Sequence, residues 1–518
     1  MRKLALAACL ALGWTAPLAS QDLAIGLGLN VTSIDPHFHN TTPNLNVAAQ
    51  IFDRLVHTDA QQRPVPGLAL SWRTLDPTTW EFVLRDDVKF SDGTPFEAQD
   101  VLASLRRAPA VPNSPSSFGI YTRAIASAEA PAPNRVVIRT REPYPLLPYD
   151  LSAVNIVSRA AETASTADFN SGRSAIGTGP FKVVSWTPGD RLVVERNPFW
   201  WGGAVPWARV TFRLIVNDTA RVAALLAGDV QMIEAVPPTD IARLERDPAL
   251  RVSRSLTTRF FFLHPDQFRD ITPFATDKAG NVLPHNPLQD ARVRRAISHA
   301  INRAAIAERL FSGQAVPAGG VVPDGFFGGD PELKAPAFDP DLAKRLLAEA
   351  GYPDGFAITL HGPNDRYVND DQVVQAIAQM LARVGIQTKV ETMPWATFAS
   401  RSNRPDFSLI YIGWLSATGE ASSTLRSLLA TFNRETGMGS SNRGRFSDAA
   451  FDAKLAEALG EMDDGKREQA LRAATRLAMD AQGIVPLLYQ YSVWAMRKPL
   501  AYGPRADDQT WAAWVRPD

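Results

Sequence analysis

The chain has 518 residues, 45% hydrophobic and 21% charged, which excludes a disordered or fibrous protein and predicts roughly two or three globular domains. Its 54 basic and 54 acidic residues cancel. Nucleic-acid-binding proteins usually carry a basic surplus, so we expect no nucleic-acid partner.

The first twenty residues have the layout of a secretory signal peptide. Met1, Arg2 and Lys3 begin with charge, residues 4–14 are apolar, and residues 17–20 end in small side chains. The apolar run is too short for a permanent membrane helix. A lipoprotein-like box ends at Cys9, but only residues 4–8 precede it as apolar region, so we expect no lipid anchor there. We predict an exported, periplasmic chain that is not membrane-embedded.

The first part of the mature chain alternates between strands and helices. Residues 22–29 predict a strand, residues 30–44 a loop and residues 46–55 a helix. Trp80, Phe82 and Leu84 alternate with residues of the opposite face, as in a half-buried strand. Thr94 and Glu97 match a capping box that would start the next helix.

The later part predicts β-α-β units. Residues 181–185 and 191–195 form a hairpin by their turn residues, and Asp218 is expected to cap a helix between two strands. Helical spacing and strand-like runs then alternate toward the C-terminus. The expected elements are helices at 293–301, from 340 and at 372–384, and strands at 356–360, 386–391 and 407–412.

Several motifs occur in an order that matches one family. They are Ser33-Ile34-Asp35-Pro36-His37, Gln50-Ile51-Phe52-Asp53-Arg54-Leu55, Trp80 to Arg107, Gly177-Thr178-Gly179-Pro180-Phe181 with Asn197-Pro198-Phe199-Trp200-Trp201, and Asp290-Ala291-Arg292-Val293-Arg294-Arg295-Ala296-Ile297. The chain thus resembles the family 5 extracellular solute-binding proteins, which are peptide- and nickel-type receptors of ABC importers.

The resemblance implies an α/β fold, namely a two-lobed periplasmic binding protein of type II in its large three-domain variant, with mixed β-sheets. By analogy, residues 21–45, 176–260 and 486–518 would form lobe 1 (domain I). Residues 46–175 would be an inserted α+β subdomain (domain II), and residues 261–485 would form lobe 2 (domain III).

No motif for enzymatic chemistry stands out. The chain has no Gly-x-Ser-x-Gly elbow, no phosphate-binding Gly-x-x-x-x-Gly-Lys and no His-Glu-x-x-His. Asp35, His37 and His39 have metal-ligand chemistry, but nearby loop residues alone complete no four-ligand site, and we expect no metal and no cofactor. The arginines at 292, 294, 295 and 303 predict a solvated helix face, with docking to a transporter as the other interpretation.

The stretch after residues 407–412 is the candidate ligand site. Tyr411 lies in the predicted strand, Gly413 would let the backbone turn, and Trp414 would lie beyond the strand's carboxyl end, where α/β sheets bind ligands. The flat ring of Trp414, together with the polar side chains of Ser416 and Glu420, suits a small polar ligand. The alternative is a buried core tryptophan followed by a surface loop.

The resemblance adds residue roles and a difference. Peptide-binding relatives carry an Asp three residues after this Trp, which pairs with the ligand α-ammonium, whereas this chain has Ala417. Glu420 could supply that charge, and Arg366 lies near the position of an Arg that receives a peptide carboxylate in dipeptide-binding relatives. Phe38, Trp395 and Trp494 are further candidates for lining, each also suited to the core.

We therefore expect a monomeric, non-enzymatic receptor. It would capture a small-molecule or short-peptide ligand between two lobes and deliver it to an inner-membrane ABC permease. Three alternatives stay open: a metal-chelate (nickel-type) receptor, a secreted hydrolase on the same architecture, and a chaperone-like periplasmic protein.

Overall fold

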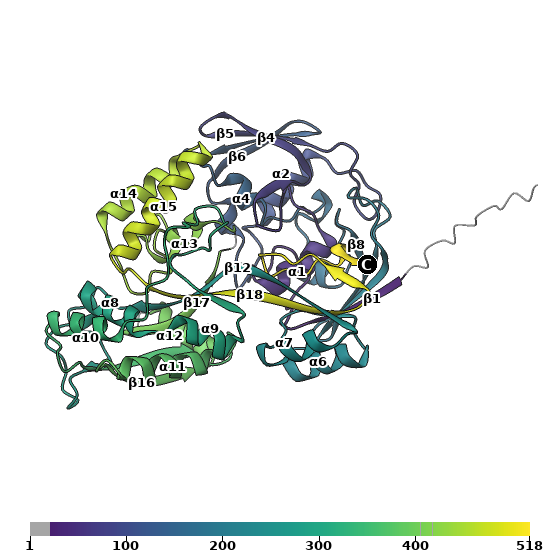
Figure 1. Ribbon diagram of the computed structural model, residues 1–518. Helices are drawn as coiled ribbons and strands as arrows, with labels where there is room; N and C mark the ends of the chain where they lie inside the picture. The colour runs from purple at the N-terminus through teal and green to yellow at the C-terminus, as the bar shows by residue number, and fades with distance from the viewer. Residues whose placement is uncertain (1–20, 405, 417) are drawn as a thin grey trace, which may run out of the picture.

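The computed structural model describes residues 21–404, 406–416 and 418–518. The signal-peptide prediction for residues 1–20 and the site prediction for Ala417 lie outside the described residues. One 12-stranded sheet runs through the molecule in the order β13-β15-β17-β12-β18-β11-β1-β10-β9-β8, and β14 and β16 pair beside this path (Figure 1). The large mixed sheet, with helices around it, confirms the expected α/β class.

The first lobe contains β1 between two parallel neighbours, β10 and β11, with helix α6 connecting them as the predicted β-α-β unit. The predicted hairpin is confirmed as β8 and β9. This lobe comprises β1 (Gln21–Leu27), α1 (Thr42–Ile51), β8 (Phe181–Thr187), β9 (Arg191–Arg196), β10 (Trp207–Leu214), α6 (Asp218–Ala227), β11 (Met232–Ile233), α7 (Pro238–Arg246), β19 (Leu500–Tyr502), η3 (Ala512–Trp514) and β20 (Val515–Pro517).

Two helix starts in the first lobe differ from the prediction. Helix α1 begins at Thr42 rather than at residue 46, because Pro43 occupies its first turn, where the missing N–H removes no hydrogen bond. Helix α6 is capped by Asn217, whose Oδ1 accepts from the Ala220 N–H at 2.9 Å, so Asp218 is a helical residue and not the cap.

The middle unit follows α1 and is built on a separate four-stranded sheet in the order β4-β5-β7-β6. Its elements are β2 (Val56–Thr58), β3 (Pro64–Pro66), β4 (Ala69–Asp76), β5 (Thr79–Leu84), α2 (Ala98–Arg107), α3 (Gly119–Thr122), β6 (Ile125–Ala132), β7 (Arg135–Thr140) and α4 (Leu147–Leu151). The following η1 (Arg159–Ala161) and α5 (Thr166–Asn170) place Ala161 and Phe169 in the core of the first lobe. The expected strand at Trp80 is confirmed. The expected capping box is wrong, since Thr94 donates to Asp92 in the preceding turn while Asp100 accepts from the Glu97 N–H at 2.8 Å.

The second lobe has β15 parallel to both β16 and β17, with α11 and α12 as the connecting helices, which confirms the predicted β-α-β arrangement. Its elements are β13 (Ala275–Thr276), η2 (Pro287–Gln289), α8 (Ala291–Ala300), α9 (Arg303–Phe311), β14 (Ala315–Pro317), α10 (Pro340–Glu349), β15 (Ala357–Pro363), α11 (Asp370–Ala382), β16 (Gln387–Met393), α12 (Trp395–Asn403), β17 (Leu409–Leu415), α13 (Ala421–Leu428), α14 (Ala449–Gly460) and α15 (Asp464–Asp480).

Two long antiparallel strands, β12 (Leu250–Pro265) and β18 (Val485–Arg497), belong to both lobes (Figure 1). On β12, Phe261 packs into one core of the second lobe and Phe260 and Phe262 into another, which explains the unbroken apolar run. The register between β12 and β18 shifts between Leu256 and Phe260, and such irregularities bend a pair of strands. The predicted domain boundaries near residues 260 and 485 fall on these strands and stay a prediction.

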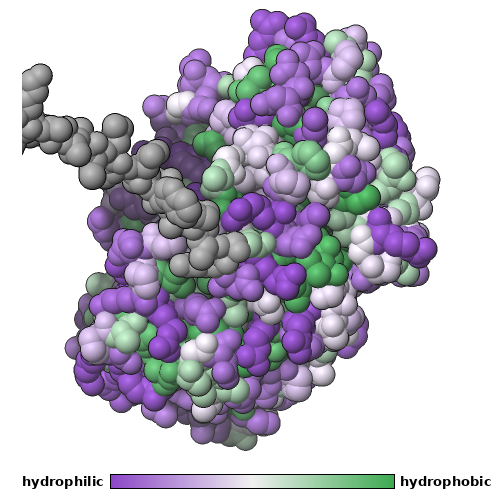
Figure 2. Space-filling model, turned by 90° about the vertical axis from the view of Figure 1, so that its right-hand side faces the viewer, coloured by the Kyte–Doolittle hydropathy of each residue, from purple (hydrophilic) through white to green (hydrophobic). Residues whose placement is uncertain are grey.

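One face of the molecule is shown by residue hydropathy in Figure 2. Figure 2 shows hydrophilic residues over most of the face that it presents, with apolar residues in separate spots. No helix of the described residues is both long enough and apolar enough to cross a membrane.

Candidate functional site

The candidate site lies where three parallel strands of the second lobe end at one edge. After β15 comes the segment of Arg366 and Tyr367, after β16 comes Trp395, and β17 carries Trp414 near its end. Carboxyl ends of parallel strands are where α/β sheets bind ligands, because connecting loops diverge there. Side chains from three separate parts of the sequence therefore lie at one edge.

Arg366 is an exposed cation at this edge, next to the exposed Asp365. Its guanidinium carbon lies 5.1 Å from the ring centre of Trp395 and 5.9 Å from that of Tyr367. Asp365 holds the arrangement by accepting from the Trp395 N–H at 2.7 Å. A guanidinium close to aromatic rings is attracted to their faces, and its N–H groups can still donate to a planar anion such as a carboxylate.

Tyr367 joins this edge to β17. Its hydroxyl donates to the Gly413 carbonyl at 3.1 Å, and its ring meets those of Trp395 at 6.1 Å and Phe261 at 5.2 Å between centres. Burial raises the pKa of Tyr367, so the hydroxyl stays protonated as a donor. Tyr367 was not predicted as a site residue from the sequence. Its position next to the candidate Arg366, a few residues after the predicted strand 356–360, was an available signal.

The strand at Trp414 is longer than predicted. β17 continues to Leu415 because β12 pairs with it through the register Arg259↔Leu415, so Trp414 lies inside the strand and not beyond its end. The Trp414 side chain is half-buried against the core of the second lobe. Tyr411 is fully buried and packs on Phe261, with ring centres 5.6 Å apart, and burial raises its pKa well above the usual value. Tyr411 therefore packs in the core of the second lobe and supports the site from the interior.

Ser416 and Glu420 form the start of helix α13. Glu420 is 0% exposed, and its carboxylate accepts from the N–H groups of Ser422 at 3.2 Å and Ser423 at 3.1 Å. Arg467 lies 3.4 Å from the same carboxylate, and the Ser416 hydroxyl donates to the Glu420 carbonyl at 2.9 Å. These oxygens are engaged within the chain, as a helix cap paired with a buried cation. A ligand role for either residue stays a prediction.

The loop around Phe38 belongs to the first lobe. Phe38 is half-buried, and its carbonyl accepts from the Ser114 hydroxyl at 2.6 Å. Neighbouring Asp35 forms a buried ion pair with Arg107 at 2.7 Å. His37 is fully buried, and desolvation together with the charge of Arg107 lowers its pKa to about 4. This loop is thus held by internal contacts, and Trp494, whose Nε1 donates to Thr510 at 2.8 Å, lies in the first-lobe core.

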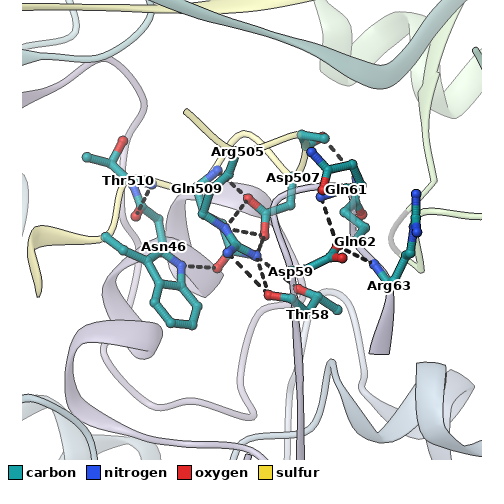
Figure 3. A network of polar contacts seen from close by, with 12 residues as sticks. Asn46, Thr58, Asp59, Gln61, Gln62, Arg63, Arg505, Asp507, Gln509 and Thr510 are labelled. Carbon is teal, nitrogen blue, oxygen red and sulfur yellow. Dashed lines mark hydrogen bonds and ion pairs between the residues drawn. The ribbon is translucent and has the colours of Figure 1, made fainter. Parts of the chain in front are cut away.

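The C-terminal segment is pinned to the start of the middle unit by a polar network (Figure 3). Arg505 pairs with Asp507 at 2.6 Å and donates to the Thr58 hydroxyl at 2.9 Å, while Gln62 donates to the Ala506 carbonyl at 2.9 Å. The network makes the middle unit and the C-terminal part of the first lobe one connected body.

The four arginines of the expected solvated helix face differ in burial. Arg294 and Arg303 are buried and donate to backbone carbonyls, such as that of Ala481 at 2.8 Å and Pro486 at 2.8 Å, so the solvated-face prediction is wrong for them. These carbonyls come from distant segments, which helical spacing does not show.

Among residues 21–404, 406–416 and 418–518, no group of three or more His, Cys, Asp or Glu side chains is placed to hold a metal.

Comparisons with known proteins show the family of the chain. The model of the bacterial extracellular solute-binding proteins, family 5 (middle), matches residues 63–436, which is more than half of the chain. The chain is 29% identical over 511 residues to the glutathione-binding protein GsiB of Escherichia coli O157:H7, covering 96% of this chain and 93% of GsiB.

Two solved structures have similar folds. HbpA2 from Haemophilus parasuis matches with a TM-score of 0.82 at 22% identity, covering 96% of this chain and 100% of HbpA2. The Escherichia coli murein tripeptide binding protein MppA matches with a TM-score of 0.74 at 25% identity, covering 96% of this chain and 99% of MppA. The protein belongs to the family 5 bacterial extracellular solute-binding proteins.

Proposed function

We propose that the protein is the periplasmic substrate-binding component of an ABC importer and captures a peptide-like solute between its two lobes. The observation that carries the proposal is the exposed guanidinium of Arg366, held on Trp395 at the joint carboxyl end of three parallel strands. A fixed guanidinium fits a carboxylate, and the adjacent aromatic faces fit the apolar parts of a peptide.

The family and the named relatives support this solute class. Glutathione and a murein tripeptide, the solutes in the names of two similar proteins, are peptide compounds with carboxylates. We propose that residues 1–20 export the chain to the periplasm, that it acts as a monomer without catalytic residues, and that its partner is an inner-membrane ABC permease.

Capture would work by a population shift. A solute that touches both lobes binds the closed arrangement better than the open one and therefore raises the closed fraction. Long strands β12 and β18, with their shared irregularity near Leu256, are the proposed place where the chain bends.

Isothermal titration calorimetry with glutathione and with a pool of tripeptides tests the proposal. We expect one solute per chain, and at least about tenfold weaker binding in Arg366→Gln, since a charged hydrogen bond contributes about 1.5–3 kcal/mol. Trp414→Ala should also weaken binding. Arg345→Gln, at an exposed position of α10, is the matched control and should keep full affinity. Unchanged affinity in both Arg366→Gln and Trp414→Ala would reject this site.

A further inference from the structure

A cluster of buried polar side chains joins the second lobe to the middle unit, apart from the connecting strands. We call it the clasp. Its members from the second lobe are Glu420, Arg426 and Arg467, and its members from the middle unit are Tyr144, Tyr149 and Asp150. In Figure 1, helices α13, α14 and α15 lie beside the middle unit, and Leu459 and Met462 pack against the core of that unit.

The first contact of the clasp runs from α13 to the middle unit. Arg426 Nη1 lies 3.5 Å from the Tyr144 hydroxyl, which itself donates to Asp150 at 2.6 Å. Asp150 is 3% exposed. Burial raises the pKa of Asp150 to about 7, the charge of Arg426 and the Tyr144 hydrogen bond oppose this, and the charge of Glu420 adds to it.

The second contact runs from α15. The guanidinium carbon of Arg467 lies 4.1 Å from the ring centre of Phe327 and 5.3 Å from that of Tyr149. Arg467 is 1% exposed and pairs with Glu420 at 3.4 Å. An aromatic ring of the middle unit thus covers a cation of the second lobe.

Two glycines beside the clasp show how closely the second lobe approaches the middle unit. A Cβ atom at Gly419 would lie 2.2 Å from the Gln62 side chain, and one at Gly437 would lie 2.5 Å from Arg123 Nη1. Gln62 and Arg123 belong to the middle unit, so the second lobe touches it at several points without a shared strand.

We propose that the clasp holds the two lobes closed in the solute-free protein and sets the fraction of closed molecules. The middle unit is fixed to the first lobe through the network of Figure 3, whereas the second lobe reaches it only by side-chain and loop contacts. Separation of the lobes about β12 and β18 must therefore break the clasp. The inference rests on the proposed two-lobed capture.

Arg426 is the residue whose loss has the clearest consequence. Without it, the contact between α13 and the Tyr144–Asp150 pair is lost, and the pKa of Asp150 rises further, so the buried carboxyl takes up a proton. Arg426→Met should therefore favour the open form. Adding Asp150→Asn should change little further, because the carboxyl is already neutral without Arg426, and a double-mutant cycle measures this coupling.

Distances between spin labels measure this directly. The only cysteine, Cys9, lies in residues 1–20, so a chain from Gln21 onward allows labelling at two introduced cysteines. Glu129→Cys in β6 and Glu457→Cys in α14 are exposed positions, 64% and 57%, on the two sides of the clasp. Pulsed electron-electron double resonance is recorded without any solute.

We expect a mainly short distance in the parent, a longer one in Arg426→Met, and no further change in Arg426→Met/Asp150→Asn. Arg345→Met, on exposed α10, should match the parent. If Arg426→Met lowers the melting temperature too far, Tyr144→Phe should shift the distance in the same direction to a smaller extent. A parent that is already mainly long, or an unchanged distance in both Arg426→Met and Tyr144→Phe, would overturn the clasp. Calorimetry with solutes remains a separate readout, so either proposal can fail alone.

Discussion

At the residue scale, burial decides what a charged side chain can do. Glu420 looked like a free carboxylate for a ligand, but its partner Arg467 lies 47 residues further along the chain, and the sequence gives no sign of that pairing. The same holds for Arg294, whose carbonyl partners come from segments near residue 481. In contrast, Arg366 was a site candidate through the family resemblance and Trp395 as a lining aromatic residue, and the structure places them side by side.

Replacing Glu420 by alanine should strongly lower stability. The change removes the cap of α13 and leaves Arg467 as a buried charge without this partner, and breaking such a buried pair costs about 3–5 kcal/mol. Thermal unfolding followed by circular dichroism measures the effect. Glu435→Ala, at an exposed loop position, is the control and should stay close to the parent. A Glu420→Ala melting temperature equal to that of the control would contradict the structural role.

The burial of His264 predicts that part of the free energy of unfolding is lost in acid. It is 2% exposed, and desolvation together with the nearby charge of Arg443 lowers its pKa from 6.5 to about 3. The unfolded chain therefore binds the proton more readily, and stability falls as pH drops from about 6.5 toward about 3, with no such loss above that window.

Urea unfolding at several pH values checks this prediction. Replacing His264 by phenylalanine should remove up to about 1.4 kcal/mol of destabilisation per pH unit within the window. His285→Gln, at an exposed position, should keep the pH profile of the parent. An identical slope in His264→Phe and the parent would show that this histidine is not held neutral.

At the element scale, the interior of each helix and strand could be predicted and several ends could not. Periodicity reports which face is buried, and this is set by local spacing. The ends depend on partners that are far away in sequence. β17 extends to Leu415 because β12 supplies hydrogen bonds, and α2 starts at Ala98 because Asp100 reaches back to Glu97.

The start of α2 allows a direct comparison between two caps. Asp100 is buried and accepts from the N–H groups of Glu97 at 2.8 Å and Arg159 at 2.8 Å, so Asp100→Ala should cost about 1–3 kcal/mol because two partly buried donors lose their acceptor. Thr94→Ala changes only a turn and should stay within about 0.5 kcal/mol of the parent. Chemical unfolding of both variants decides, and a larger loss for Thr94→Ala would restore the cap expected from the sequence.

At the scale of the whole molecule, the ordered family motifs predicted the α/β class and the two lobes, because these motifs mark turns and strand ends that the fold requires. The contact between the second lobe and the middle unit could not be predicted. It combines Tyr149 with Arg467, two residues that no local pattern connects.

As a receptor, the chain should capture a peptide-like solute and leave it chemically unchanged. Native mass spectrometry of the chain from Gln21 onward, incubated with glutathione and a tripeptide pool, measures both properties at once. We expect a single 1:1 adduct whose solute is recovered with its original mass after denaturation, and a loss of this adduct in Arg366→Gln. No adduct with any member of the pool, or recovery of cleaved products, would contradict it.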